Sequence, residues 1–272
     1  KDVSSEGTYY VWARDAAGNV SSAASIGAYT VTRSQGAGTT LTTRYDSTSS
    51  STGTSFSSNT VVLNGTNVWV SASASTGYNT VVLKRGTTTV DNPSYAAVTG
   101  NVTIASSATK TPYTVTLNKG TGISAVSGAG TYYYGDSVTI DATVATGYTW
   151  NNWTGTHSTT TKKYTFTMPA SNVTDTANAV DSTAPATPTI TRSDYNTFTY
   201  TATDGVGVTC YYVSTSSTKP TAGTCGTGTG LNVWSTVTTK DVSSAGTYYV
   251  WARDAAGNVS SAASIGAYTV TR

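Results

Sequence analysis

The sequence is poor in several residue types on which common protein functions depend. It has one histidine and two cysteines, too few to assemble a histidine-based catalytic triad or a usual zinc site. Charged residues make up 10% of the chain and the net charge is +2, which excludes the basic stripe of a nucleic-acid-binding protein. No run of about 18 apolar residues could span a membrane. No signal segment opens the sequence, so we expect any signal to lie upstream.

Leucine, methionine, glutamate and glutamine are scarce, whereas threonine, serine, glycine, valine and tyrosine dominate. β-Branched and aromatic side chains suit a half-buried sheet, so the composition predicts an all-β chain. A length of 272 residues predicts two to four small domains rather than one large core.

A segment of the chain is written twice. Residues 1–33 match residues 240–272 with a single difference, Glu6 against Ala245. Each copy predicts a hairpin, with strands in the first copy at 8–14 and about 25–32 around the turn at 15–19, where Gly18 can take a positive φ. Because an isolated hairpin is only marginally stable in water, each copy needs other strands to cover its aromatic face.

Four strand candidates precede the second copy, at residues 187–191, 197–202, 208–213 and 233–237. With the hairpin they form a unit of about 90 residues, close to the size of an immunoglobulin-type sandwich. The pattern DxTAPxxPTI from Asp181, followed by GTYYVWARDAAGNVS from Gly246, resembles the bacterial Ig-like domains of large surface proteins. The resemblance covers residues 181–272, and residues 1–33 as a half domain.

A second type of repeat lies between the two hairpins. Residues 64–78 align with residues 134–148 at an offset of 70 residues, since 148 minus 78 gives 70, and such a period indicates small tandem units. The motifs at 135–140 (GDSVTI), 147–155 (GYTWNNWTG) and 167–169 (TMP) resemble the divergent internalin-type B repeat of the Listeria-Bacteroides repeat family. The resemblance implies a small extracellular β-grasp-like module with Tyr148, Trp150 and Trp153 in its core. The first copy lacks the tryptophan strand and the Met-Pro pair, and we interpret it as a degenerate member.

The chain is therefore predicted to be a slice of a tandem array of small β-domains with a period of 239 residues, the difference between 240 and 1. Each domain of such an array has its own core and contacts mainly its neighbours. The predicted order is a hairpin from the C-terminal part of an Ig-like domain (1–33), a linker (34–38), a degenerate B-repeat module (39–109), a B-repeat module (110–180) and an Ig-like β-sandwich (181–272).

Cys210 and Cys225 are the two cysteines, and a loop rich in glycine, serine, threonine and proline separates them. In a chain with the features of a secreted protein, a disulfide is the favoured interpretation, with two reduced thiols as the alternative. Closing a loop of about 15 residues stabilises the domain by about 3 kcal/mol in the chain-entropy model.

The remaining candidates for chemistry favour ordinary structural roles. His157 lies in a predicted turn and is expected to be a solvated loop residue. The turns at 15–19 and 254–258 lack the alternating acidic ligands and terminal glutamate of a calcium-binding EF-hand, and no pair of carboxylates stands out as a glycosidase site. We therefore predict no catalytic residue, cofactor or metal, and no enzymatic activity.

These features predict a structural extracellular protein, located on a bacterial cell surface or secreted. It would be a stalk, or a subunit of a surface fibre, filament or adhesin. The alternative is an array of glycan-binding modules attached to a secreted enzyme or adhesin, which would hold glycan through exposed aromatic rings. Tyr148, Trp150 and Trp153 could form a sugar-stacking platform, but core packing is the favoured interpretation. The tyrosines at 132–134 and 211–212 must expose some rings and are candidate adhesive or interface patches.

The first hairpin is the predicted subunit interface. Tyr9, Val11, Trp12 and Tyr29 lack the strands expected to cover their counterparts in the second copy. The expected partners are neighbouring copies of the chain in a head-to-tail assembly, or another part of the same long polypeptide. Glycan remains a further candidate partner. If separate chains assemble through this hairpin, deleting residues 1–33 should abolish polymerisation and leave the Ig-like domain folded.

Overall fold

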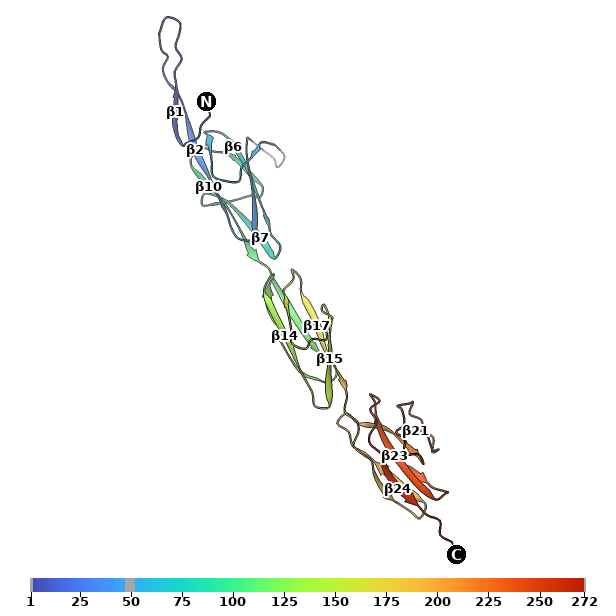
Figure 1. The fold of residues 1–272 in the computed structure, drawn as a ribbon. Coiled ribbons are helices and arrows are strands. Elements are labelled where there is room, and N and C mark those ends of the chain that lie inside the picture. Colours follow the sequence, from blue (N-terminus) through green and yellow to red (C-terminus); the bar gives the residue numbers. More distant parts are fainter. Residues whose placement is uncertain (1, 47–51, 272) are drawn as a thin grey trace. The chain divides into compact units, whose positions relative to one another are not determined.

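The computed structural model describes residues 2–46 and 52–271. These residues form strands in several small sheets and no helix, which confirms the predicted all-β class (Figure 1). Within them, no helix is long and apolar enough to cross a membrane. Their contacts divide the chain into two compact units. The first comprises Lys1–Thr114, Thr131–Val138 and Phe166–Asn172, and the second comprises Val115–Gly130, Thr139–Thr165 and Val173–Arg272.

The first hairpin forms as predicted, with β1 (Gly7–Val11) antiparallel to β2 (Ala24–Gln35). Its turn is fixed by Asp15, whose Oδ1 accepts hydrogen bonds from the backbone N–H groups of Ala17 and Asn19. Gly18 has a φ of 96°, a conformation that glycine adopts without steric cost. Aspartate and glycine therefore determine the turn locally.

Strand β2 is longer than the sequence predicted, and it belongs to two structures. Its first half pairs with β1, while its second half pairs antiparallel with β5 (Thr60–Leu63) and parallel with β10 (Val102–Lys110) (Figure 1). Ser34 and Gln35, predicted to begin a linker, lie within β2 and pair with β10. The first repeat module thus takes one of its strands from the hairpin.

The first repeat module consists of two sheets around a core of aliphatic side chains. In the sheet that contains β2, β10 also pairs with β7 (Tyr78–Arg85), which pairs with β8 (Thr88–Val90). The second sheet has the order β4 (Thr54–Ser55), β3 (Thr39–Tyr45), β6 (Asn67–Ala74) and β9 (Ser94–Ala97). Val31, Val68, Val70, Leu83 and Ile104 are fully buried in the core.

The second repeat module has the same arrangement, with β17 parallel to β11 as β10 is parallel to β2. Its sheets have the orders β13-β11-β17-β15 and β12-β14-β16. The strands are β11 (Pro112–Lys119), β12 (Ile123–Ser127), β13 (Gly130–Tyr133), β14 (Ser137–Val144), β15 (Tyr148–Gly155), β16 (Tyr164–Thr167) and β17 (Val173–Asp181).

Residues 181–272, predicted to be an Ig-like β-sandwich and called the Ig-like domain below, contain two sheets that pack on one core. One has the order β18 (Thr189–Arg192), β19 (Thr197–Thr201) and β22 (Thr239–Asp241). The other has the order β21 (Trp234–Ser235), β20 (Val208–Ser214), β23 (Gly246–Asp254) and β24 (Ala263–Ala267). Side chains of both sheets form one core cluster, which includes Phe198, Tyr200, Val213, Tyr248 and Val250.

A second cluster packs against the β20–β23 sheet and contains the cysteines. Cys210 is bonded to Cys225, with an S–S distance of 2.03 Å and a Cα–Cα distance of 6.0 Å, which confirms the predicted disulfide. Cys210 is buried together with Trp234, Trp251 and Val259. The disulfide therefore ties the loop after β20 to the side of the sandwich that covers Trp251.

Candidate functional site: the two copies of the hairpin

The two hairpin copies differ in sequence only at Glu6 and Ala245, but the first halves of the copies have different environments. Trp12 is 56% exposed, whereas its counterpart Trp251 is 1% exposed. In the second copy, β20 pairs with β23 and places Tyr212 opposite Trp251, while Trp234 and Cys210 pack around the indole. In the first copy, Trp12 stacks against Tyr10 at a centroid distance of 5.9 Å. The first copy therefore lacks the covering strands that the Ig-like domain supplies to the second.

In the second halves of the two hairpin copies, the first copy is the buried one and the second copy is exposed. Val31 is 0% exposed and its counterpart Val270 is 92% exposed. Tyr29, predicted to be uncovered, is half-buried and pairs with Val62 of β5. That expectation was wrong for Tyr29, because the first repeat module supplies strands β5 and β10 to this half of the hairpin. The uncovered tyrosine is the counterpart in the second copy, Tyr268, at 89% exposure.

A short sequence motif marks the part of the hairpin that also belongs to a repeat module. The tetrapeptide Tyr-Thr-Val-Thr occurs at 29–32, at 113–116 and at 268–271. In the first module, the side-chain oxygen of Asn101 accepts a hydrogen bond from the Thr30 N–H at 2.8 Å. In the second, the side-chain oxygen of Asn172 accepts one from the Thr114 N–H at 2.9 Å. The tetrapeptide thus lies in the opening strand of each repeat module, whereas residues 268–271 have the same sequence but form no strand.

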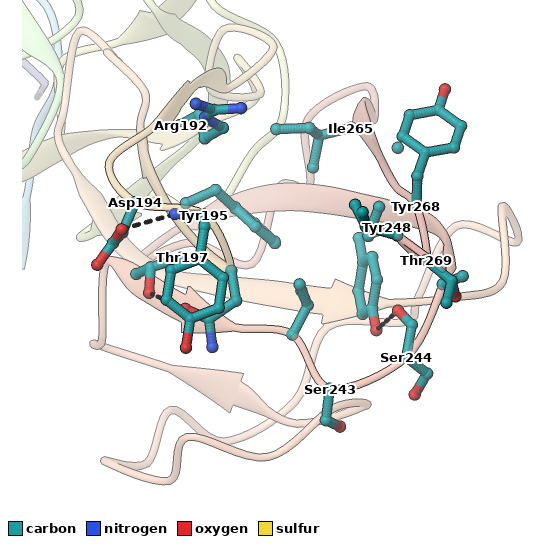
Figure 2. Close-up of a pocket in the computed structure, with 17 residues that line it drawn as sticks. Arg192, Asp194, Tyr195, Thr197, Ser243, Ser244, Tyr248, Ile265, Tyr268 and Thr269 are labelled. Carbon is teal, nitrogen blue, oxygen red and sulfur yellow. Dashed lines mark hydrogen bonds between the residues drawn. The ribbon is translucent and has the colours of Figure 1, made fainter. Parts of the chain in front are cut away.

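A pocket of about 600 Å³ lies beside the exposed end of the second copy (Figure 2). Its lining includes Tyr195, Tyr248, Ile265, Tyr268 and Val270. Tyr248 donates a hydrogen bond from its hydroxyl to the Ser244 carbonyl oxygen at 3.1 Å (Figure 2). Tyr195 is 86% exposed, so two exposed tyrosine rings, Tyr195 and Tyr268, border the pocket.

The three aromatic residues assigned to the core of the second repeat differ in burial. Trp153 is 0% exposed, and its indole N–H donates to the Lys162 carbonyl oxygen at 2.8 Å. Tyr148 and Trp150 are half-buried, and the rings of Trp150 and Trp153 are 5.5 Å apart. The fully buried position is therefore that of Trp153.

His157 is not the solvated loop residue that the sequence predicted. Its Nδ1 lies 2.7 Å from Oδ2 of Asp175, and its backbone N–H donates to Oδ1 at 2.7 Å. Asp175 is 0% exposed, so the loop at His157 supplies two contacts to a buried carboxylate. The arrangement anchors the loop against β17.

The tyrosine patches expected to be adhesive or interface surfaces are only partly exposed. Tyr133 and Tyr134 are 41% and 48% exposed, whereas Tyr211 is buried in the sandwich and Tyr212 is half-buried. The hydroxyl of Tyr211 accepts a hydrogen bond from the Ala202 N–H. The pair at 211–212 therefore serves the Ig-like domain rather than an open surface.

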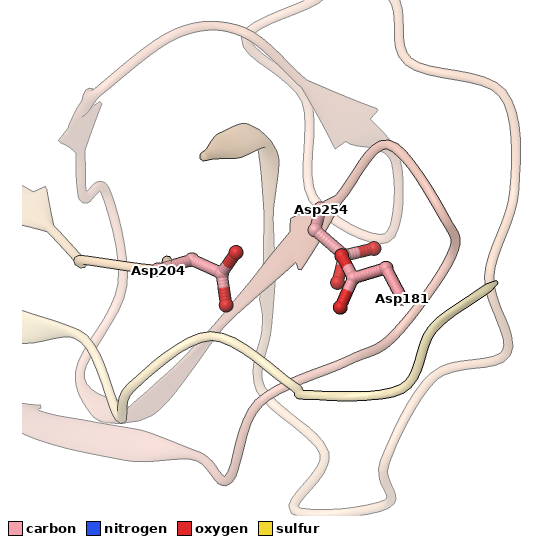
Figure 3. Close-up of side chains that lie close together, drawn as sticks. All are labelled: Asp181, Asp204 and Asp254. Carbon is pink, nitrogen blue, oxygen red and sulfur yellow. The ribbon is translucent and has the colours of Figure 1, made fainter. Parts of the chain in front are cut away.

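Three aspartates that lie far apart in the sequence come together in the second compact unit (Figure 3). They are Asp181 at the end of β17, Asp204 between β19 and β20, and Asp254 at the end of β23. They are separated by 23 and 50 residues, from 181 to 204 and from 204 to 254, so no local motif predicts their proximity.

Comparison with known proteins identifies the second repeat module. The model of the divergent InlB B-repeat domain matches residues 113–179, which confirms the resemblance seen in the sequence. No curated protein matches the chain. Among solved structures, the Bacillus anthracis TIE protein is similar at 8% identity and a TM-score of 0.37, over 96% of this chain and 51% of that one. The chain spans about half the length of that structure.

The repeat-family match indicates an extracellular surface repeat protein and a structural rather than an enzymatic domain. The disulfide agrees with an extracellular or surface location.

Proposed function

We propose that this chain is part of the stalk of a bacterial surface protein, in which one hairpin copy joins each Ig-like domain to the repeat module that follows it. The observation that carries this proposal is the complementary burial of the two copies. The first copy has its second half covered by a repeat module, and the second copy has its first half covered by an Ig-like sandwich. In an array with the 239-residue period, every internal copy would have both halves covered.

The same comparison favours one long polypeptide over a filament of separate chains. At a junction between two separate chains there are two hairpin copies for one Ig-like domain and one repeat module. If one copy is covered on both halves, the other is covered on neither, so the total buried apolar surface is unchanged. Association also costs about 4 to 15 kcal/mol in translational and rotational freedom. Noncovalent exchange of hairpins therefore has no net driving force from burial, whereas a covalent array needs a single copy at each junction.

Hydrogen exchange in an extended protein tests this proposal. The extended protein continues the sequence beyond Arg272 with a second copy of residues 34–272. Backbone amides of residues 268–271 at the new junction should become protected, because Thr269 would receive the contact that Asn101 makes to Thr30. The 272-residue chain is the control, in which these amides should exchange rapidly. Equal exchange in the two proteins would contradict the shared-hairpin arrangement.

The pocket beside Tyr195 and Tyr268 supports a second candidate function, glycan binding. Exposed aromatic rings bordering an open pocket are a suitable platform for a sugar face. Tyr268 would be covered by a following repeat module, so Tyr195 is the ring that remains available in an array. Saturable polysaccharide binding that is lost in Tyr195→Ala and retained in Tyr10→Ala would support this function.

A further inference from the structure

We propose that Asp181, Asp204 and Asp254 form a calcium-binding site at the start of the Ig-like domain. One side-chain oxygen from each of the three lies within 4.8 Å of the other two. Figure 3 shows the Asp204 carboxylate directed toward the adjacent carboxylates of Asp181 and Asp254. Three segments far apart in the sequence thus bring three carboxylates to one point.

Two buried oxygens in this cluster have no hydrogen-bond partner. Oδ2 of Asp181 and Oδ2 of Asp204 are both buried and unpartnered. The other oxygen of each carboxylate is held by the backbone: Oδ1 of Asp181 accepts from Thr183 N at 3.1 Å, and Oδ1 of Asp204 accepts from Val206 N at 2.8 Å and Gly207 N at 3.0 Å. Each side chain is therefore fixed by one oxygen while the second is left unsatisfied. A buried acceptor without a partner is costly, and a cation would satisfy both.

The third carboxylate is the most deeply buried. Asp254 is 0% exposed, and its Oδ1 accepts from the backbone N–H groups of Gly257 and Asn258 at 2.7 and 2.9 Å. Its Oδ2 accepts from the Asn258 side-chain amide at 2.8 Å. These neutral donors orient the carboxylate but bring no positive charge to it.

The protein supplies no counter-ion to this group of acids. Among residues 2–46 and 52–271, one ion pair has a nitrogen–oxygen distance of 4.0 Å or less, and it joins His157 and Asp175. Within that distance, no lysine or arginine of these residues contacts the carboxylates of the three aspartates. Ionised carboxylates taken out of water need a partner charge. Since three like charges lie together, a bound cation accounts for their position better than mutual contact does.

The donor set and its dimensions favour calcium. Carboxylate oxygens are hard ligands that select Ca²⁺ and Mg²⁺ over softer metals. Two oxygens on opposite sides of one Ca²⁺ lie up to about 5 Å apart, twice the usual Ca–O distance, whereas the limit for Mg²⁺ is about 4.2 Å. The three ligand oxygens lie within 4.8 Å of one another, an upper limit that is compatible with the larger ion. Further ligands would come from backbone carbonyls or water, as is usual for Ca²⁺.

The first hairpin copy provides an internal comparison. Asp15 is the counterpart of Asp254, and it holds the same turn through Ala17, Asn19 and the Asn19 side chain. Asp15 is exposed, and among residues 2–46 and 52–271 it belongs to no group of three or more potential metal ligands. The turn sequence alone is therefore insufficient, and the site requires the complete Ig-like domain and the end of β17.

Calorimetric titration of the full chain with CaCl₂ after chelation tests the proposal. We expect saturable binding of one Ca²⁺ with a dissociation constant of about 10⁻⁴ to 10⁻³ M, the range of extracellular calcium modules. The Asp204→Asn variant should bind at least about tenfold more weakly, because it removes one ligand charge. The double variant with Asp181→Asn and Asp204→Asn should show no measurable binding, and Asp15→Asn should bind like the original chain.

Thermal unfolding separates a metal site from a purely structural role. In excess chelator, Asp204→Asn should be at least as stable as the original chain, because asparagine keeps the Oδ1 acceptor for Val206 and Gly207 and removes one negative charge. With Ca²⁺, the original chain should be the more stable. Equal loss of stability with and without Ca²⁺ would contradict the proposal. Absence of a saturable Ca²⁺ signal up to about 10 mM, weaker binding by Asp15→Asn, or tighter binding of Mg²⁺ than of Ca²⁺ would also overturn it.

Discussion

Trp12 and Trp251 occupy equivalent positions in two copies of one sequence, yet only the second is enclosed. The burial of a side chain is determined by the strands around it, and the first hairpin copy has no counterpart of β20 among the described residues. Substituting each tryptophan in turn therefore measures how much the surrounding strands contribute to stability, because the local sequence around both residues is the same.

We expect Trp251→Ala to destabilise the Ig-like domain by about 3 to 5 kcal/mol through loss of packing and formation of a cavity. Trp12→Ala should change the stability of the chain by less than about 0.5 kcal/mol, as is usual for exposed positions. Chemical denaturation followed by domain-specific NMR signals would measure both. A loss of comparable size in Trp12→Ala would mean that the first copy is covered in solution.

Tyr200 gives the Ig-like domain a dependence on alkaline pH. Burial in the sandwich, with a contribution from Tyr211, raises the pKa of Tyr200 to about 12 from 10.0. The unfolded chain releases this proton near pH 10 and the folded domain retains it, so stability should fall as the pH rises from 10 toward 12. Melting curves over this range should show a weaker decline in Tyr200→Phe. An unchanged decline would assign the effect to other tyrosines.

Sequence reasoning located some single residues correctly and missed others for a physical reason. Cys210 and Cys225 were identifiable as a pair because no other cysteine competes with them. Asp181, Asp204 and Asp254 were not, because each lies in an unremarkable turn or strand end and only the tertiary fold brings them together. The His157–Asp175 contact was missed for the same reason.

At the scale of elements, the sequence predicted some strands of the sandwich well because turns separate them. It missed β22, and the strand predicted at 233–237 is limited to Trp234–Ser235. The predictions at 197–202 and 208–213 correspond to β19 and β20. The boundary between the hairpin and the first repeat was harder to predict. No turn residue interrupts β2 between Ala28 and Gln35, and the recurring Tyr-Thr-Val-Thr was the available signal.

Two truncations test the shared strand. Deleting residues 1–23 removes β1 and should leave the first repeat module folded, because β5 and β10 still have β2 as their neighbour. Deleting residues 1–35 removes β2 as well and should unfold that module, since the buried Val31 and the pairing with β10 are lost. Amide NMR spectra would distinguish the two results. A folded first module in the shorter protein would show that β2 is dispensable.

The disulfide is expected to stabilise the Ig-like domain alone. Its sequence separation is 15 residues, for which the chain-entropy model gives about 3 kcal/mol. Replacing both cysteines by serine should lower the unfolding free energy of that domain by about this amount and leave the repeat modules unaffected. Differential scanning calorimetry should show a shift in one transition, and a shift in all of them would contradict independent domains.

At the scale of the whole molecule, the stalk proposal predicts the behaviour of the chain in solution. Because hairpin exchange leaves the buried apolar surface unchanged, the 272-residue chain should remain monomeric over a wide concentration range. Sedimentation velocity would test this. Polymers that grow with concentration and disappear on deletion of residues 1–33 would instead support a filament of separate subunits.

The continuity of β2 also determines how the chain responds to tension. A pull transmitted along the backbone passes from the hairpin into the first repeat module through strand residues, since β2 runs without a break from Ala24 to Gln35. The parallel ladder between Val31–Gln35 and Val102–Ser106 would then be loaded along the strands, so that its hydrogen bonds must yield together rather than one after another. A junction of this kind resists extension at the point where a flexible linker would give way first.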